Sequence, residues 1–263
     1  MKSAVRTGPK PSKLYVTYFK KVVPPSKDEI KRHNAGFYLG LSLQTQTIFS
    51  NLSENDGVLN VNSKVETDTS RDATRVCFLI EDHPGIFSRL AGAIALSGAN
   101  VIDARSYTTS DGYATSVFWI QSKEGKPFEE NRLSKLNKTI NEALKGQIIA
   151  RDILKEKGKI KRKEKDFIVP TNITFDNEGS EIHTIIEIET RDRIGLLYDL
   201  TRTLSDNYTS ISSAIIATYG EHAVDTCYIK DLFGLKLHSQ KKIKIKEKKI
   251  KEVIQVGTLI SSD

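Results

Sequence analysis

Apolar positions follow the same order twice along this chain. In the first copy, a continuous apolar run at residues 76–80 predicts an inner strand that is covered by helices. Apolar residues then recur every four positions from Ile86 to Ile94, which predicts a helix with one apolar stripe. Two more strands are expected at residues 101–107 and 117–120. The order up to this point is strand, helix, strand, strand.

A second helix and a short strand close the first copy. The spacing of Leu133, Leu136, Ile140 and Leu144 predicts the helix, and residues 148–150 are expected to form the strand. The complete order is βαββαβ. It is typical of the ferredoxin-like α+β unit, in which an antiparallel sheet carries both helices on one face.

The second copy lies 110 positions further along the chain. This shift places Asp82 on Asp192 and Gly85 on Gly195, without a gap from the first strand through the third. Because each copy of a repeated unit must carry the same core pattern, residues 182–231 are predicted to form a second unit of the same kind. The fold class is therefore α+β, with two tandem ferredoxin-like βαββαβ units.

The last element of the second copy has two interpretations. Residues 242–246 alternate between lysine and isoleucine as a strand would, whereas Ile243, Ile250 and Ile254 share one face of a helix. We prefer the helix.

The repeats divide the chain into five segments. Ser26 and Glu29 form a capping box, so a helix is expected to begin near Lys27. The apolar residues between Phe37 and Leu52 are helix-like but too few for a domain, so we expect them to pack on another part of the chain. The expected segments are a disordered basic N-terminus (1–25), a helical connector with a lead-in strand (26–73), a first domain (74–154), a linker (155–172) and a second domain with a Lys-rich C-terminal helix (173–263).

Length and composition agree with two folded domains. The chain has 263 residues, of which 38% are hydrophobic and 28% charged, which suffices for a core in each repeat. No apolar stretch reaches the roughly 20 residues that a membrane helix needs. The basic N-terminus is not followed by an apolar signal segment. We expect a cytoplasmic protein without a membrane partner.

The net charge of +7 raises the question of nucleic-acid binding. Much of the excess lies in lysine runs at residues 155–165 and 236–251, which contain no aromatic side chain on which a base could stack. We expect solvated surface there and no nucleic-acid partner. Cys77 and Cys227 stand singly inside predicted strands, so we expect neither a disulfide nor a metal site.

Two βαββαβ units with an acidic residue ahead of a glycine-containing turn are similar to ACT domains, small regulatory modules that sense amino acids. The similarity extends to four stretches, at residues 82–93, 98–105, 173–177 and 224–236. Together these resemble the C-terminal tandem ACT region of the bifunctional PII uridylyltransferase/uridylyl-removing enzymes. The resemblance covers roughly residues 74 to 237.

This resemblance implies an enzyme that also has a nucleotidyltransferase domain and an HD-type hydrolase domain. The chain has no Gly-Gly or Gly-Ser loop followed by Asp-x-Asp and no His-Asp dipeptide, and its histidines are scattered. No catalytic residue is expected, and Mg²⁺ is expected only in the missing catalytic domains. The implied partners are glutamine or a similar small amino acid, the catalytic part of the same enzyme and, indirectly, the PII protein.

A stand-alone ACT-repeat protein remains the alternative. Such a protein would dimerise by joining sheets edge to edge and would have no enzymatic partner. A homodimer of the regulatory region also stays open.

The resemblance places the ligand at the turn between the first strand and the first helix of a repeat. Free amides at a helix N-terminus can receive an α-carboxylate, and an acidic side chain such as Asp82 can hold an α-ammonium. Asn100 could read a side-chain amide or the ligand backbone. The candidate residues are Asp82, His83, Pro84, Gly85, Ile86 and Asn100 in repeat one, and Asp192, Arg193, Gly195, Leu196 and Ser210 in repeat two.

Each candidate also has a structural interpretation. Asp82 could cap the helix, Gly85 could serve the turn, and Asn100 could be a turn residue. His83 is expected to be an exposed turn residue rather than a base.

The two copies of the turn are not equivalent. Repeat two has Ile194 in place of the proline and Ser210 at the position of Asn100. We therefore predict that repeat one is the better sensor and that repeat two contributes to a shared interface. Ligand binding is expected to shift the two repeats between two arrangements, with the hinge at the linker 155–165, Pro170 and the strand near Ile173.

Overall fold

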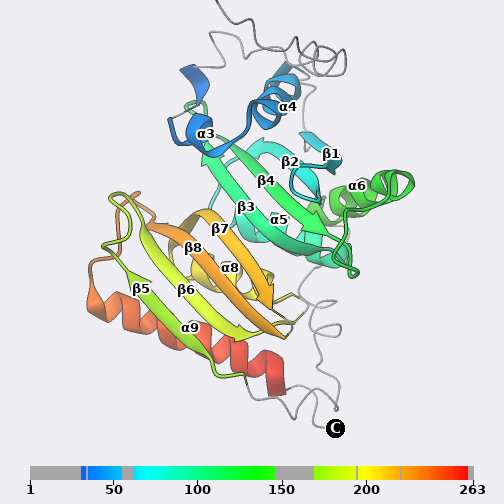
Figure 1. Ribbon diagram of the computed structural model, residues 1–263. Coiled ribbons are helices and arrows are strands. Elements are labelled where there is room, and N and C mark those ends of the chain that lie inside the picture. The colour runs from blue at the N-terminus through cyan, green and yellow to red at the C-terminus, as the bar shows by residue number, and fades with distance from the viewer. Residues whose placement is uncertain are drawn as a thin grey trace, which may run out of the picture.

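The computed structural model describes residues 31–33, 35–54, 62–145, 169–193, 195–219 and 221–259, with side chains up to residue 256. Within these ranges, eight strands form one antiparallel sheet, in the order β1-β2-β4-β3-β7-β8-β6-β5 (Figure 1). Four adjacent strands come from each repeat, and β3 of repeat one pairs with β7 of repeat two. The two repeats thus share a single sheet.

The elements of the two repeats correspond one to one. Repeat one consists of β1 (Asn62–Asp68), β2 (Ala73–Glu81), α5 (Ile86–Leu96), β3 (Asn100–Thr108), β4 (Tyr113–Gln121) and α6 (Glu130–Leu144). Repeat two consists of β5 (Asn172–Asp176), β6 (Thr184–Arg191), α8 (Leu196–Asp206), β7 (Thr209–Tyr219), β8 (His222–Asp231) and α9 (Gln240–Leu259). The predicted α+β class with two ferredoxin-like repeats is confirmed, and so is the C-terminal helix.

The lead-in strand predicted before residue 74 and the strand expected near Ile173 are present as β1 and β5, and each forms an outer edge of the sheet, which the sequence did not indicate. In repeat one this strand is β1, which pairs with β2 along its whole length. The observed order is therefore ββαββα over the described residues, and the strand expected at residues 148–150 lies outside them. The pattern of β1 was uninformative because Val65 is its only apolar residue.

One apolar core lies between the sheet and helices α5, α6, α8 and α9. Its strand residues occupy matching positions in the two repeats, since Val76 and Phe78 in β2 correspond to Ile186 and Ile188 in β6. Helices α5 and α8 lie side by side beneath the junction of β3 and β7. In α9, the residues Ile243, Ile250 and Ile254 face this core, which is why the segment is a helix.

The other face of repeat one is covered by α3 (Ala35–Gly40) and α4 (Leu43–Glu54). Phe37 and Phe49 pack there against Cys77, Val117 and Trp119. Helices α3 and α4 correspond to the helical connector predicted within residues 26–73, and they pack on the sheet of repeat one. The helix expected from Lys27 begins outside the described residues, as do the N-terminus and linker residues 155–168.

No helix in the described part of the chain has the length and apolar character to cross a membrane. Both cysteines are free, and their side chains are fully buried in the strands, where the sequence analysis expected small buried side chains.

Candidate ligand site between the repeats

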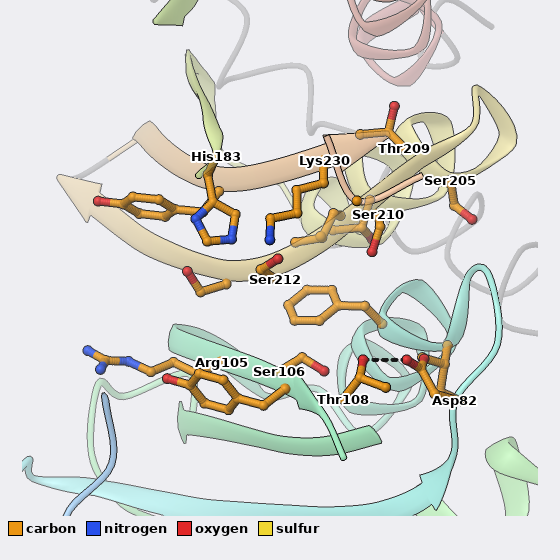
Figure 2. A pocket seen from close by; sticks show the side chains of 18 of the residues that line it. Asp82, Arg105, Ser106, Thr108, His183, Ser205, Thr209, Ser210, Ser212 and Lys230 are labelled. Carbon is orange, nitrogen blue, oxygen red and sulfur yellow. Dashed lines mark hydrogen bonds between the residues drawn. The ribbon is translucent and has the colours of Figure 1, made fainter. Parts of the chain in front are cut away.

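A cavity of about 1080 Å³ opens where the two repeats join (Figure 2). Strands β3 and β7 pair at only three positions, from Asp103 to Arg105 on β3. Beyond Arg105, the last residues of β3 and the first residues of β7 have no strand partner between them, and the cavity occupies this gap. Residues of both repeats therefore line it.

The turn before α5 forms one end of this cavity. Gly85 has a left-handed backbone (φ 87°), which lets the chain turn directly from Asp82 into the helix. The Asp82 amide donates to the Gly112 carbonyl (2.9 Å), and the Thr108 hydroxyl donates to Asp82 Oδ2 (2.6 Å). These bonds fix the carboxylate at the rim of the cavity.

The first turn of α5 presents free hydrogen-bond donors to the same space. The Ile86 amide donates to the His83 carbonyl (3.0 Å) and the Arg89 amide to the Gly85 carbonyl (3.1 Å). Among the described residues, the amides of Phe87 and Ser88 find no acceptor, and both residues line the cavity. Free amides at a helix N-terminus together with a nearby carboxylate suit a small zwitterion.

The wall opposite this turn comes from repeat two. A Cβ atom at Gly85 would lie 3.0 Å from the Ser205 hydroxyl of α8. Ser205, Ser210 and Ser212 line the cavity and place hydroxyl groups across from the turn (Figure 2). The turn of repeat one thus meets the end of α8 and the start of β7.

Asn100 does not join Asp82 and Gly85, contrary to the expectation from the sequence. It is exposed at the start of β3, opposite Gln121 on β4, and is not among the residues that line the cavity. The reason is the antiparallel pairing of β3 with β7, which brings the start of β7 to the turn of repeat one. Ser210, the counterpart of Asn100 in repeat two, is the residue that lies in the same cavity as Asp82.

The turn of repeat two has the same backbone but no share in this cavity. Gly195 is again left-handed (φ 82°), and the Leu196 amide donates to the Arg193 carbonyl (3.1 Å). Arg193 forms an ion pair with Asp199 (2.6 Å), and neither Asp192 nor Gly195 lines the cavity. Ile194 lies outside the described residues.

Tyr198 accounts for part of this difference. It occupies in repeat two the position of Ser88, and its side chain is buried against Leu96 of α5. Its hydroxyl accepts a hydrogen bond from Arg202 (3.1 Å). A large ring therefore lies where repeat one has a small hydroxyl and open space.

A second difference is a buried carboxyl group at turn two. Asp225 of β8 is 1% exposed, and its Oδ1 atom has no hydrogen-bond partner among the described residues. Burial, together with the charge of Asp192, raises the pKa of Asp225 to about 7. Burial also raises the pKa of Asp192, against the hydrogen bonds from Arg193 and Thr218.

Repeat one has a hydroxyl pair at the place of Asp225. Ser116 lies opposite Phe78 on β2, as Asp225 lies opposite Ile188 on β6, and its hydroxyl is 2.7 Å from that of Ser106. Sequence reasoning did not single out Asp225. The available signal was a carboxylate between Ala223 and Cys227 on the apolar face of a strand.

The described residues do not fit a metal ion. They contain no group of three or more His, Cys, Asp or Glu side chains arranged to hold one.

Comparison with known proteins places this geometry in a class. Residues 172–257 match a family model described as an ACR9-like, ACT-like domain. With a ferredoxin-like repeat and a ligand-sized cavity at the junction of two such units, the chain is an ACT-domain protein.

Bifunctional uridylyltransferase/uridylyl-removing enzymes are similar over most of this chain. The enzyme of Cereibacter sphaeroides is 53% identical over 229 residues, which cover 87% of this chain and 25% of that protein. That of Ruegeria pomeroyi is 52% identical over 237 residues (88% and 26%), and that of Rhodospirillum rubrum 40% identical over 195 residues (73% and 21%). The chain belongs to this family through its ACT region. It spans about a quarter of the length of these relatives.

Proposed function

We propose that this chain is the glutamine-sensing regulatory region of a PII uridylyltransferase/uridylyl-removing enzyme. The observation that supports it most is the cavity that both repeats line at the turn before α5. A ligand held there would contact both halves of the sheet. Its binding would therefore report on, and bias, how the repeats are arranged.

In this proposal the ligand lies across the junction. Its α-carboxylate accepts hydrogen bonds from the Phe87 and Ser88 amides, where the positive end of the α5 dipole also favours an anion. Its α-ammonium pairs with Asp82. The hydroxyls of Ser210 and Ser212, from repeat two, contact the remainder of the molecule.

The affinity needed for such a sensor is modest. A dissociation constant near 1 mM corresponds to about 4 kcal/mol of binding free energy, which a few hydrogen bonds supply. Binding changes the enzyme only insofar as the ligand prefers one arrangement of the repeats over another. The proposed site lies between β7 and the turn before α5. A change in the distance between these two elements would alter the contacts of the ligand, so the ligand would bind one arrangement of the repeats more tightly than the other.

The rest of the relatives' length would hold the catalytic parts. The proposal assigns to them the transfer and removal of uridylyl groups on the PII protein, together with the need for Mg²⁺, in the cytoplasm. This chain alone would then be inactive in a uridylylation assay with PII.

The alternative is a stand-alone interaction protein, and the outer edges of the sheet favour it. Among the described strands, β1 and β5 each have a single neighbour, so both ends of the sheet could pair with a second copy. Sedimentation equilibrium tests this alternative. A dimer that forms irrespective of glutamine, in a chain that binds no amino acid, would favour it over the sensor.

Isothermal titration calorimetry with glutamine tests the sensor directly. We expect millimolar binding by the wild type and about tenfold weaker binding by Asp82→Asn, which loses the charge that holds the ammonium. Glu124→Gln removes an exposed carboxylate of the same repeat and should bind like the wild type. A folded wild-type chain that releases no heat with glutamine would remove the proposal.

A further inference from the structure

Lys230 carries an ammonium group without a partner inside the cavity. It lies on β8, half-buried, and lines the cavity between the repeats. Among the described residues, its side-chain ammonium has neither a hydrogen-bond nor an ion-pair partner. Figure 2 shows its side chain pointing from β8 into the cavity toward Ser212, beside His183. A half-buried cation that faces a cavity and has no partner in the protein is available to an anion.

Hydroxyl groups surround this ammonium. Ser210 is the residue opposite Lys230 on the β7–β8 ladder, so the two side chains leave the same face of the sheet about 5 Å apart at Cβ. Ser212 sits at the bulge that follows, where β7 carries an extra residue relative to β8. One ammonium and two hydroxyls that converge on open space form a donor-rich pocket for oxygen atoms.

The other charged groups around the cavity already have partners. The Arg105 guanidinium donates to the Gly40 carbonyl and lies 3.6 Å from an oxygen of Asp103. Asp231 accepts from the amides of Phe233 and Leu235, both at 2.9 Å. Arg105 is itself a cation, and Asp231 could neutralise Lys230 only by giving up these amide hydrogen bonds.

His183 completes this end of the cavity. Burial lowers its pKa, and the charge of Lys230 lowers it further, so the imidazole is neutral near pH 7. Its ring lies edge-on against Tyr228, with centroids 6.0 Å apart. The neutral ring adds a polar contact but no second positive charge beside Lys230.

We propose that the Lys230 end of the cavity is an anion subsite that accepts a carboxylate, separate from the turn that holds Asp82. The cavity is far larger than one amino acid, and Figure 2 shows Asp82 and Thr108 well apart from Lys230 and His183. Its ligands are small dicarboxylates or acidic amino acids. This subsite goes beyond the proposed function and does not require glutamine to be the effector.

The two ligand sources differ at the Asp82 end. An acidic amino acid would place its side-chain carboxylate at Lys230 and its ammonium in the part of the cavity toward Asp82, whose negative charge attracts it across the intervening space. A free dicarboxylate lacks an ammonium and would bind through Lys230 without help from Asp82. Asp82→Asn should therefore weaken L-glutamate binding and leave glutarate binding unchanged if both sources are used.

Calorimetric titration of the full chain with glutarate and with L-glutamate tests the subsite. Loss of one charge-assisted hydrogen bond should weaken binding of both probes tenfold or more in Lys230→Gln. Lys241→Gln makes the same change of charge on the exposed face of α9 and should bind like the wild type. Far-UV circular dichroism confirms that each variant is folded.

His183 supplies a second readout that a merely structural role for Lys230 would not move. An anion beside Lys230 should shift the His183 imidazole resonances in the NMR spectrum of the wild type and not in that of Lys230→Gln. Equal affinity of the wild type and Lys230→Gln for both probes would overturn the proposal. So would a wild type that binds neither probe, whatever its response to glutamine.

Discussion

Asp225 should make the stability of this protein fall as the pH rises. Its pKa in the folded chain is raised from 3.8 to about 7, because the carboxyl group is buried close to Asp192. A carboxyl group with a raised pKa favours folding below its unfolded pKa, where both states are protonated. That advantage is lost as the pH rises through the folded pKa. The window therefore runs from about pH 4 to about pH 7.

The size of the effect follows from the shift. About three pKa units at about 1.4 kcal/mol each give at most about 4 kcal/mol of lost stability once Asp225 is ionised. Asp225→Asn keeps the shape of the side chain and cannot ionise. It should match the wild type within about 1 kcal/mol near pH 4.5 and exceed it by up to about 4 kcal/mol at pH 8.5.

Urea unfolding followed by far-UV circular dichroism, repeated across this pH range, measures the difference. Glu178→Gln removes an exposed carboxylate of the same repeat and should keep the pH dependence of the wild type. Asp192 also has a raised pKa, so Asp225→Asn should retain a shallower slope. If its free energy of unfolding depends on pH as steeply as that of the wild type, the burial argument is wrong.

Two further substitutions test the junction. Gly85→Ala should destabilise the fold by about 1–2 kcal/mol through its positive φ angle, and more because the new Cβ would meet Ser205. Gly98 also has a positive φ, but a Cβ there would meet no atom within 4 Å, so Gly98→Ala is the control for backbone strain alone. Chemical denaturation of the two variants therefore isolates the contact of the new Cβ at residue 85 with Ser205. Equal losses of unfolding free energy in the two variants would contradict that contact. Tyr198→Ser should lose about 3–5 kcal/mol because its ring packs on Leu96, whereas an unchanged denaturation midpoint would contradict that packing.

The repeat made most of the fold predictable. Residues with strong periodicity, such as Ile86 to Ile94, became the elements that their pattern indicated. The ambiguity at residues 242–246 could be decided only by the core, where Ile243 packs beneath the sheet. The apolar pattern did not identify β1 as the edge of the sheet. This strand pairs only with β2 among the described strands and has a single apolar residue, so its sequence shows no clear alternation of apolar and polar positions.

The candidate site was predictable in part. The turn at Asp82 and Gly85 follows from local sequence, because its conformation depends on neighbouring residues. Its partners do not, since they are set by which strands of the two repeats pair. Asn100 was therefore grouped with a turn that Ser210 in fact faces. Lys230 and Asp225 were missed for the same reason, because their roles depend on long-range burial and contact.

A structure of this chain with saturating glutamine would test the central claim most directly. The account predicts glutamine density in the cavity between the repeats, with the carboxylate at the amides of Phe87 and Ser88, the ammonium at Asp82, and Ser210 in contact from β7. Density beside Asn100, or an empty cavity at several times the millimolar dissociation constant, would contradict it.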